Sequence, residues 1–367
     1  MNITEVLVPA QQMAWLPWAT QYFFFIGSAY GAAILFIIAL IFKQYTTHQL
    51  RAALVLTLAI CAVVGPLALT GDLHQPGRAW HFYAYLTSWS WMSMGSIFLP
   101  IFSGLAVLTA WLYLRNDLMN LQKSDNKVFQ VISRLSLGQW KTCHSMMISV
   151  ASATVVSSLS IAFYTGAEIA AVHARPLWDQ PASPLIWFTT AFLGAVGLSL
   201  IIWLLFPKQG TANELSKTDI RMVKQTIILS SILALILIPI WASGNVVFSL
   251  FDNSDWVNNL VILALSIFSC VILVLLTMRF NCSRLVLFCN ALVSITACWI
   301  TRWITMMEVQ TIPKFDAGPY PYSLPMGSSG LLGILGMLGL WIALAMLASE
   351  LVQPKRNHND DTTLTNH

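Results

Sequence analysis

The sequence predicts an all-α integral membrane protein with about nine membrane-spanning helices. Of its 367 residues, 57% are hydrophobic and only 9% are charged, whereas soluble domains carry roughly 25% charged residues. The apolar residues form runs near the roughly 20 residues that a helix needs to cross the hydrocarbon core. These runs are continuously apolar instead of alternating, which favours helices over a membrane β-barrel.

Each expected helix is an apolar run between polar connections. The first, Ala19–Phe42, is not preceded by the basic segment and small-residue cleavage site of a signal peptide, so we expect it to remain as an anchor. A connection over 114–143 is expected to form a polar surface excursion, and residues 353–367 a short disordered tail. The other helices are expected at Ala52–Thr70, Trp89–Tyr113, His144–Ala171, Pro184–Phe206, Thr226–Leu250, Trp256–Met278, Leu285–Met306 and Met326–Ala348.

The basic residues predict the orientation in the membrane. Alternate connections divide the 19 Lys and Arg residues very unequally, and only Arg78, Arg175, Arg302 and Lys314 fall on the poorer side. Because basic connections stay in the cytoplasm, we expect an N-terminus on the outer side of the membrane and a C-terminus in the cytoplasm. The net charge of +4 is too small and too scattered for a nucleic-acid-binding surface, so the expected surroundings are membrane lipid.

The cysteine and histidine residues argue against a metal centre in this chain. The six cysteines contain no C-x-x-C pair, which argues against an iron–sulfur cluster or a disulfide framework. A membrane b-type haem needs histidine ligands inside the bilayer on facing helices. His144 only opens its helix, and the other histidines lie in connections or the tail, so we expect no haem.

Unusual polar residues gather on the outer side of the expected bundle. The connection 71–81 places Asp72, His74 and Arg78 within a few residues of one another. Polar clusters at the edge of a membrane bundle are costly and are therefore candidate functional sites. An acid, an imidazole and a guanidinium together could exchange protons with a bound substrate.

Tyr164 and Glu168 form a second candidate pair near the end of the fourth helix. Their i, i+4 spacing places the phenol and the carboxylate on one helix face. Glu168 lies in an otherwise apolar stretch, where it is a candidate proton acceptor. The alternative is a structural role, in which Glu168 pairs with Arg175, Arg302 or a backbone amide.

Three further residues are expected at a similar depth. Arg302 lies about one turn from the outer end of the eighth helix, so it either reaches to the interface or neutralises Glu168 or Asp72. Gln21 and Tyr22 near the start of the first helix add hydrogen-bonding groups.

Several short motifs, in the expected order, resemble the NrfD/polysulfide reductase membrane-subunit family. Residues 72–81, Asp-Leu-His-Gln-Pro-Gly-Arg-Ala-Trp-His, resemble its D-L-G-x-P-x-R-x-x-H signature, and residues 90–95 its S-P-M-S-W-G segment. Tyr-Thr-Gly at 164–166 and Arg-Pro-Leu-Trp at 175–178 are similar to two further elements. The sequence departs from the family pattern at His74, Trp91, Met94 and Glu168. Residues 15–18 and 21–25 are similar to the tetrathionate reductase branch.

The resemblance implies two four-helix bundles, 19–171 and 184–306, with an added helix at 326–348. It also implies a site for menaquinol or ubiquinol near the outer face of the first bundle, and no haem or cluster in this chain. The implied partners are a ferredoxin-like iron–sulfur subunit on the outer face and a molybdenum-containing catalytic subunit.

The function that these expectations favour is the quinol-oxidising membrane anchor of an anaerobic respiratory reductase of tetrathionate, polysulfide or nitrite type. Tyr164, Gln21 and Tyr22 would line the quinone site, and Arg78 and Arg302 would set its charge. The expected proton acceptors are Glu168, Asp72 and His74.

Three alternatives remain open from the sequence. The same site could reduce quinone with electrons from an outer-side dehydrogenase. A secondary transporter would show interrupted helices in its two halves, for which Pro100 and Pro239 are the candidates. A purely structural anchor would bind no quinone and would tolerate changes at Tyr164 and Glu168.

Overall fold

The computed structural model describes residues 13–73, 75–123, 126–138, 140, 142–207, 215–244, 249–279, 282–312 and 322–352. Within these residues every regular element is helical, and nine helices are long and apolar enough to cross a membrane. This confirms the predicted fold class. The long helices are α1 (Pro17–Ile41), α2 (His48–Asp72), α4 (Trp91–Asn120), α6 (His144–Ala170), α7 (Ala182–Leu205), α8 (Lys217–Ser243), α9 (Ser254–Thr277), α10 (Arg284–Trp303) and α12 (Leu331–Ser349).

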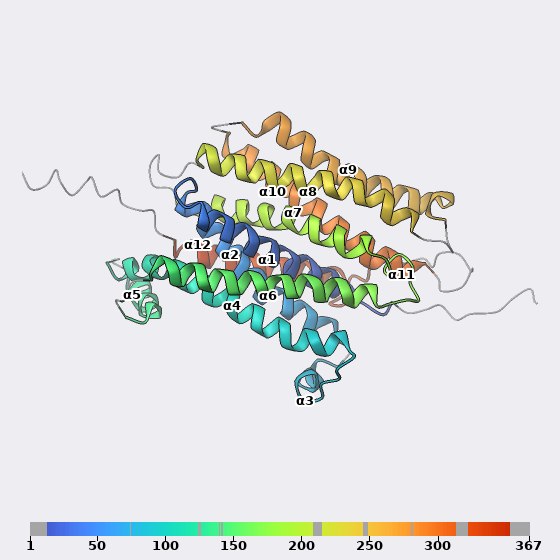
Figure 1. Ribbon diagram of the computed structural model, residues 1–367, viewed down its shortest axis with the longest axis horizontal. Helices are drawn as coiled ribbons and strands as arrows, with labels where there is room; N and C mark the ends of the chain where they lie inside the picture. Colours follow the sequence, from blue (N-terminus) through green and yellow to red (C-terminus); the bar gives the residue numbers. More distant parts are fainter. Residues whose placement is uncertain are drawn as a thin grey trace, which may run out of the picture.

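The long helices run side by side along the longest axis of the molecule (Figure 1). α1, α2 and α7 form the centre: in their most apolar stretches 72–78% of the residues are buried, compared with 22% in α9 and α12. α4 and α6 contact the centre on one side, whereas α8, α9 and α10 lie on the other (Figure 1). α12 packs against α1, α2 and α7. The central row therefore joins the two groups of helices.

Short elements mark the two ends of the bundle. We call the end where α1 begins the α3 end, after the short helix α3 (His81–Ala84), which follows the 3₁₀ turn η1 (Pro76–Arg78). The opposite end, where α1 finishes, is the α5 end, after α5 (Lys127–Ser133). Figure 1 shows α5 at the left end of the bundle and α3 below the opposite end of α4.

Side-chain caps explain where several helices begin. The Thr47 hydroxyl accepts a hydrogen bond from the Leu50 amide at the start of α2, at 3.2 Å. α8 begins with a capping box, in which Ser216 and Asp219 each accept from the other's backbone amide. Such caps satisfy amides that the first helical turn leaves without partners.

The boundaries expected for two helices are wrong. α8 spans Lys217–Ser243 instead of 226–250, because its first turns are polar and are specified by the capping box instead of by hydropathy. α4 continues to Asn120, so the first residues of the expected polar excursion are helical. Arg115 and Asp117 are buried in this extension, where the Arg115 guanidinium donates to the Ser136 and Gly138 carbonyls.

Two prolines and one π-helical turn are relevant to the alternative functions that the sequence left open. Pro100 and Pro239 lie inside α4 and α8, and each helix continues through its proline. α10 is followed by a π-helical turn, Ile304–Glu308, and a final turn, Val309–Thr311. π turns are rare and often occur at functional sites. The expected tail, 353–367, lies outside the described residues.

Candidate functional site

Buried polar side chains gather where the α3 end of α1 meets the end of α6. Gln21 and Tyr22 lie in the second turn of α1, and Tyr164 and Glu168 lie in the last two turns of α6. Tyr22 is 0% exposed and Glu168 8%. α1 can begin here because Pro17 occupies its first turn, where a missing N–H costs no hydrogen bond. The helix packing thus brings together Tyr22, Tyr164 and Glu168, three residues that the sequence nominated, and Gln21 lies next to Tyr22 in the chain.

Several buried polar atoms of this cluster have no hydrogen bond of good geometry within the described residues. Within the described residues, the Tyr22 hydroxyl, the Gln21 Nε2 and both carboxylate oxygens of Glu168 are buried and make no hydrogen bond. The Tyr164 hydroxyl is nevertheless close enough to the Tyr22 hydroxyl and to the Glu168 carboxylate for a weak hydrogen-bonding contact with each. A buried polar group without a partner costs about 1–3 kcal/mol. The cluster therefore has donor and acceptor atoms that a ligand with hydrogen-bonding groups could satisfy.

A cavity of about 90 Å³ adjoins the cluster through Tyr164. Its other walls come from the end of α2, from α3 and the residue that follows η1, and from the first turns of α4. These walls are Pro66, Leu69, Thr70, Leu73, Ala79, Phe82, Tyr83, Met92, Gly95, Ser96 and Leu99. The volume is below the roughly 300–1000 Å³ of pockets that enclose whole drug-sized ligands. The cavity fits a small ring or part of a head group, with any long tail outside the protein.

Asp72 lies at the end of α2 and ties down the chain that leads into α1. Its Oδ1 accepts a hydrogen bond from the Leu16 amide at 2.8 Å. Asp72 is also close enough to interact electrostatically with Glu168. The structure thus places a second carboxylate beside the cluster, in a half-buried position.

Arg302 has a different environment from either sequence-based expectation. Its side chain is fully buried and does not reach the interface. Its guanidinium donates to the Trp187 carbonyl at 2.6 Å, to the Thr190 hydroxyl at 2.9 Å and to the Phe23 carbonyl at 3.4 Å. These are neutral acceptors, and no ion pair of Arg302 with an acidic residue occurs among the described residues.

Arg78 and Arg175 are not brought to the cluster. Arg78 is exposed in η1 and does not line the cavity. His74 lies outside the described residues. Arg175 donates to the Val309 and Ile312 carbonyls, and burial lowers the pKa of its guanidinium. The expected pairing of Glu168 with Arg175 or Arg302 is absent from the part of the chain that the structure describes.

The sequence analysis missed several residues that shape this region. Gly95 was part of a quoted motif but was not nominated, although it forms the wall next to Tyr164. Phe82 and Tyr83, from α3, also line the cavity. Thr305 in the π turn accepts hydrogen bonds from the Trp178 and Trp187 indoles at 2.6 and 2.8 Å. No feature of the apolar pattern indicates that turn.

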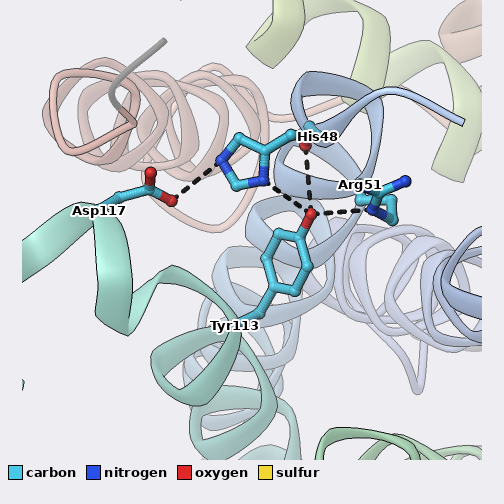
Figure 2. Close-up of polar contacts among 4 residues, drawn as sticks. All are labelled: His48, Arg51, Tyr113 and Asp117. Atoms are coloured by element: carbon cyan, nitrogen blue, oxygen red, sulfur yellow. Dashed lines mark hydrogen bonds and ion pairs between the residues drawn. The ribbon is translucent and has the colours of Figure 1, made fainter. Parts of the chain in front are cut away.

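A second polar cluster lies at the α5 end, far from the cavity, where α2 begins and α4 finishes (Figure 2). His48 Nε2 lies 3.0 Å from Asp117 Oδ2, and His48 Nδ1 lies 2.9 Å from the Tyr113 hydroxyl. Arg51 Nε donates to the same hydroxyl at 3.0 Å. This cluster is internally hydrogen-bonded, which indicates a structural link between α2 and α4. Nowhere in the described part of the chain do three His, Cys, Asp or Glu side chains converge as metal ligands.

Comparison with known proteins identifies relatives of nearly the whole chain. The model of the family described as "Polysulphide reductase, NrfD" matches residues 5–314. The chain is also similar to a tetrathionate reductase subunit of Salmonella typhimurium (strain LT2), with 34% identity over 365 residues. That match covers 95% of each of the two chains.

Proposed function

This chain belongs to the polysulphide reductase NrfD family, and from that membership we propose that it is the membrane subunit of an anaerobic respiratory reductase complex. In this proposal it oxidises menaquinol or ubiquinol at the α3 end. The electrons pass to a ferredoxin-like iron–sulfur subunit docked at that end, and from there to a molybdenum-containing catalytic subunit. The match to a tetrathionate reductase subunit, which covers 95% of the chain at 34% identity, supports this proposal.

The cluster of unpartnered polar atoms is the single observation that carries the proposal. Oxidation of one quinol releases two protons and two electrons. Gln21 Nε2 and the Tyr22 hydroxyl are buried donors without partners among the described residues, and Tyr164 lines the adjoining cavity. In this proposal Tyr164 hydrogen-bonds one ring oxygen of the quinol from the cavity wall, and Gln21 and Tyr22 serve the second oxygen where the ring extends from the cavity into the cluster. The isoprenoid tail lies outside in lipid, which is consistent with a cavity of about 90 Å³ that holds only part of the head group.

Glu168 is the proposed proton acceptor. Both of its carboxylate oxygens are buried and have no hydrogen bond of good geometry within the described residues. Tyr164, which lines the cavity, lies next to Glu168, so the proposed path of the proton from a bound hydroxyl to Glu168 passes by Tyr164. Asp72, the carboxylate nearer to the end of the bundle, is the next acceptor, and His74 is proposed to follow it. Arg302, whose guanidinium bonds the Phe23 carbonyl next to Tyr22, is proposed to contribute positive potential to the site, and Arg78 is proposed to contribute from the exposed turn η1.

The orientation completes the proposal. We place the α3 end at the periplasmic face of a bacterial inner membrane, because the connections at the opposite end carry most of the Lys and Arg residues. Protons from the quinol then leave on the periplasmic side. Electrons leave on the same side, because the partner subunit docks there.

The test is an equilibrium titration of the purified full-length chain with a short-chain menaquinone analogue. Quenching of the intrinsic tryptophan fluorescence reports binding. We expect saturable quenching that weakens in the Tyr164→Phe, Glu168→Gln double variant. The matched control is Tyr85→Phe, an exposed tyrosine that does not line the cavity. Unsaturable quenching by folded wild-type protein, or equal binding by the double variant, would contradict the proposed site.

The direction of electron flow needs a separate measurement. The same residues would serve quinone reduction by an outer-side dehydrogenase, because the protons and electrons then move in reverse. Turnover of the intact complex with a reduced artificial donor, compared with turnover with menaquinol, distinguishes the two directions. The proposal requires menaquinol to support reduction of the complex's acceptor.

A further inference from the structure

A groove of about 550 Å³ runs between α1 and α8 at the α5 end, on the opposite side of the membrane from the cavity at Tyr164. Its mouth opens away from the bundle, because Ile38, Phe42 and Leu229 at its edges are 40%, 54% and 62% exposed. Both helices cross the membrane, so this mouth faces lipid. The groove lies where a helix of the first group meets a helix of the second.

The walls of the groove are suited to hydrocarbon. Leu35, Ile38 and Phe42 of α1 face Met222 and Leu229 of α8. The groove continues inward past Leu35, Met222 and Thr226 into a small hollow of about 10 Å³, whose other walls come from α2 and α7. An empty channel of this kind would forfeit van der Waals contacts on every wall. A flexible acyl chain from the surrounding bilayer can fill it.

The part of the groove farthest toward the α5 end is polar, and Arg221 gives it a positive charge. Thr218, Arg221 and Gln225 follow one another at intervals of three and four residues, which places them on one face of α8. Arg221 makes no hydrogen bond or ion pair with any described residue. The Thr218 hydroxyl donates to the Tyr45 carbonyl. This bond holds the α1–α2 connection beside the arginine.

We propose that this groove binds one anionic glycerophospholipid of the bilayer leaflet at the α5 end. One acyl chain lies between α1 and α8, and the phosphate lies against the Arg221 guanidinium, with Gln225 as a second donor. An anionic phosphate complements a guanidinium that has no other partner among the described residues, whereas the neutral head group of a quinone does not require one. Attraction of a basic side chain to anionic lipid is an established contribution to lipid selectivity.

The experiment uses the full-length chain, stripped of lipid in a neutral detergent. Native mass spectrometry counts the bound lipid while the protein is titrated with phosphatidylglycerol or with phosphatidylcholine of the same acyl chains. We expect one phosphatidylglycerol to bind more tightly than phosphatidylcholine. Arg221→Gln should reduce that preference by about fivefold, in line with the contribution of one basic side chain near anionic lipid. Arg221→Lys should retain most of it.

Two matched controls separate the groove from the general surface. Arg279→Gln removes another exposed arginine, just beyond the end of α9, and should leave the preference unchanged. Ile38→Trp narrows the groove and should weaken binding of both lipids, whereas Leu275→Trp on the exposed face of α9 should not. Circular dichroism confirms that each variant is folded.

Several outcomes would overturn the proposal. Equal binding of the two lipids by the wild type would exclude charge selection. Equal losses in Arg221→Gln and Arg279→Gln would reduce the effect to surface charge. Displacement of the phospholipid by a menaquinone analogue would identify an isoprenoid as the occupant, and full competition by soluble glycerol phosphate would identify a free phosphate ligand.

Discussion

The phenol ring of Tyr164 lies directly against the backbone of Gly95. A Cβ atom at Gly95 would be 2.2 Å from Cζ and 2.4 Å from the hydroxyl oxygen of Tyr164. Real Cβ atoms do not approach other atoms so closely, so any other residue at position 95 must displace the ring. Because Gly95 of α4 has no side chain, the Tyr164 ring of α6 can reach the cavity.

Gly95→Ala is expected to impair the proposed quinol site without unfolding the protein. The added methyl group would shift the Tyr164 hydroxyl, and a misplacement of about 1 Å can cost about 100-fold in rate. Overpacking should also lower stability by about 1–3 kcal/mol. Quinol-dependent turnover of the assembled complex and thermal unfolding of the variant measure the two effects.

Gly104→Ala is the matched control, because Gly104 is also in α4 and a Cβ there meets nothing within 4 Å. Turnover should remain at the wild-type level in this variant. If Gly95→Ala also kept full turnover in a folded complex, the position of Tyr164 would be irrelevant to the reaction.

Glu168→Gln should lower quinol-dependent turnover by about 100-fold, the lower end of what a general base contributes. Glutamine has nearly the same shape but does not accept the proton, so the complex should still assemble. Size-exclusion chromatography of the complex checks assembly, and a stopped-flow assay with menaquinol measures the rate. Normal turnover in an assembled complex would remove Glu168 from the proton path.

Asp72→Asn separates the two functions that we give to Asp72. Asparagine keeps the Oδ1 atom that accepts from the Leu16 amide, but it does not take up a proton. We expect an unchanged unfolding temperature and a slower turnover. Asp72→Ala should lose both the hydrogen bond to the Leu16 amide and the proton acceptor, and the lost hydrogen bond should cost about 1 kcal/mol of stability. Wild-type turnover of Asp72→Asn would restrict this residue to its structural bond.

The sequence predicted the helical membrane fold well, because the average hydropathy of about 20 residues identifies a membrane-spanning helix whatever the exact apolar residues are. It failed at polar helix ends. The first turns of α8 contain Lys217, Asp219 and Arg221, which a hydropathy criterion assigns to a connection. Only the pairing of Ser216 with Asp219 marks the true start, and that signal is local and short.

For the candidate site, sequence spacing could bring Tyr164 and Glu168 to one face, but it could not show which atoms lack partners. That property depends on how α1 and α6 meet, and on where the arginines go. Arg302 is the clearest example: its position indicated a charge partner for Glu168, yet it is bonded to carbonyl and hydroxyl groups of α1 and α7. Long-range packing decides such pairings.

Arg302→Lys is expected to destabilise the bundle more than it weakens quinone binding. A single ammonium group cannot replace the planar guanidinium that bonds Trp187 and Thr190 simultaneously. Each acceptor left buried and unpaired costs about 1–3 kcal/mol. Thermal unfolding by circular dichroism should show a clear loss, and Arg279→Lys, at an exposed position, should not. A large loss of affinity for the quinone analogue at unchanged stability would instead indicate a direct role in the site.

The pair of His48 and Asp117 at the α5 end should contribute to stability and not to turnover. The two side chains are 3.0 Å apart and connect the start of α2 to the extended part of α4 (Figure 2). A double-mutant cycle with His48→Gln, Asp117→Asn and the double variant isolates their interaction, for which we expect about 1 kcal/mol, as is usual for residues in direct contact. Unfolding by SDS in mixed micelles, followed by circular dichroism, gives the free energies.

Tyr113→Phe should also destabilise the protein, because the Tyr113 hydroxyl bonds both His48 and Arg51. Tyr45→Phe changes an exposed ring and should leave the free energy of unfolding unchanged. Additive losses of stability in the double-mutant cycle would contradict a direct interaction between His48 and Asp117. A fall in quinol-dependent turnover at unchanged stability would show that this cluster is coupled to the site at the other end of the bundle.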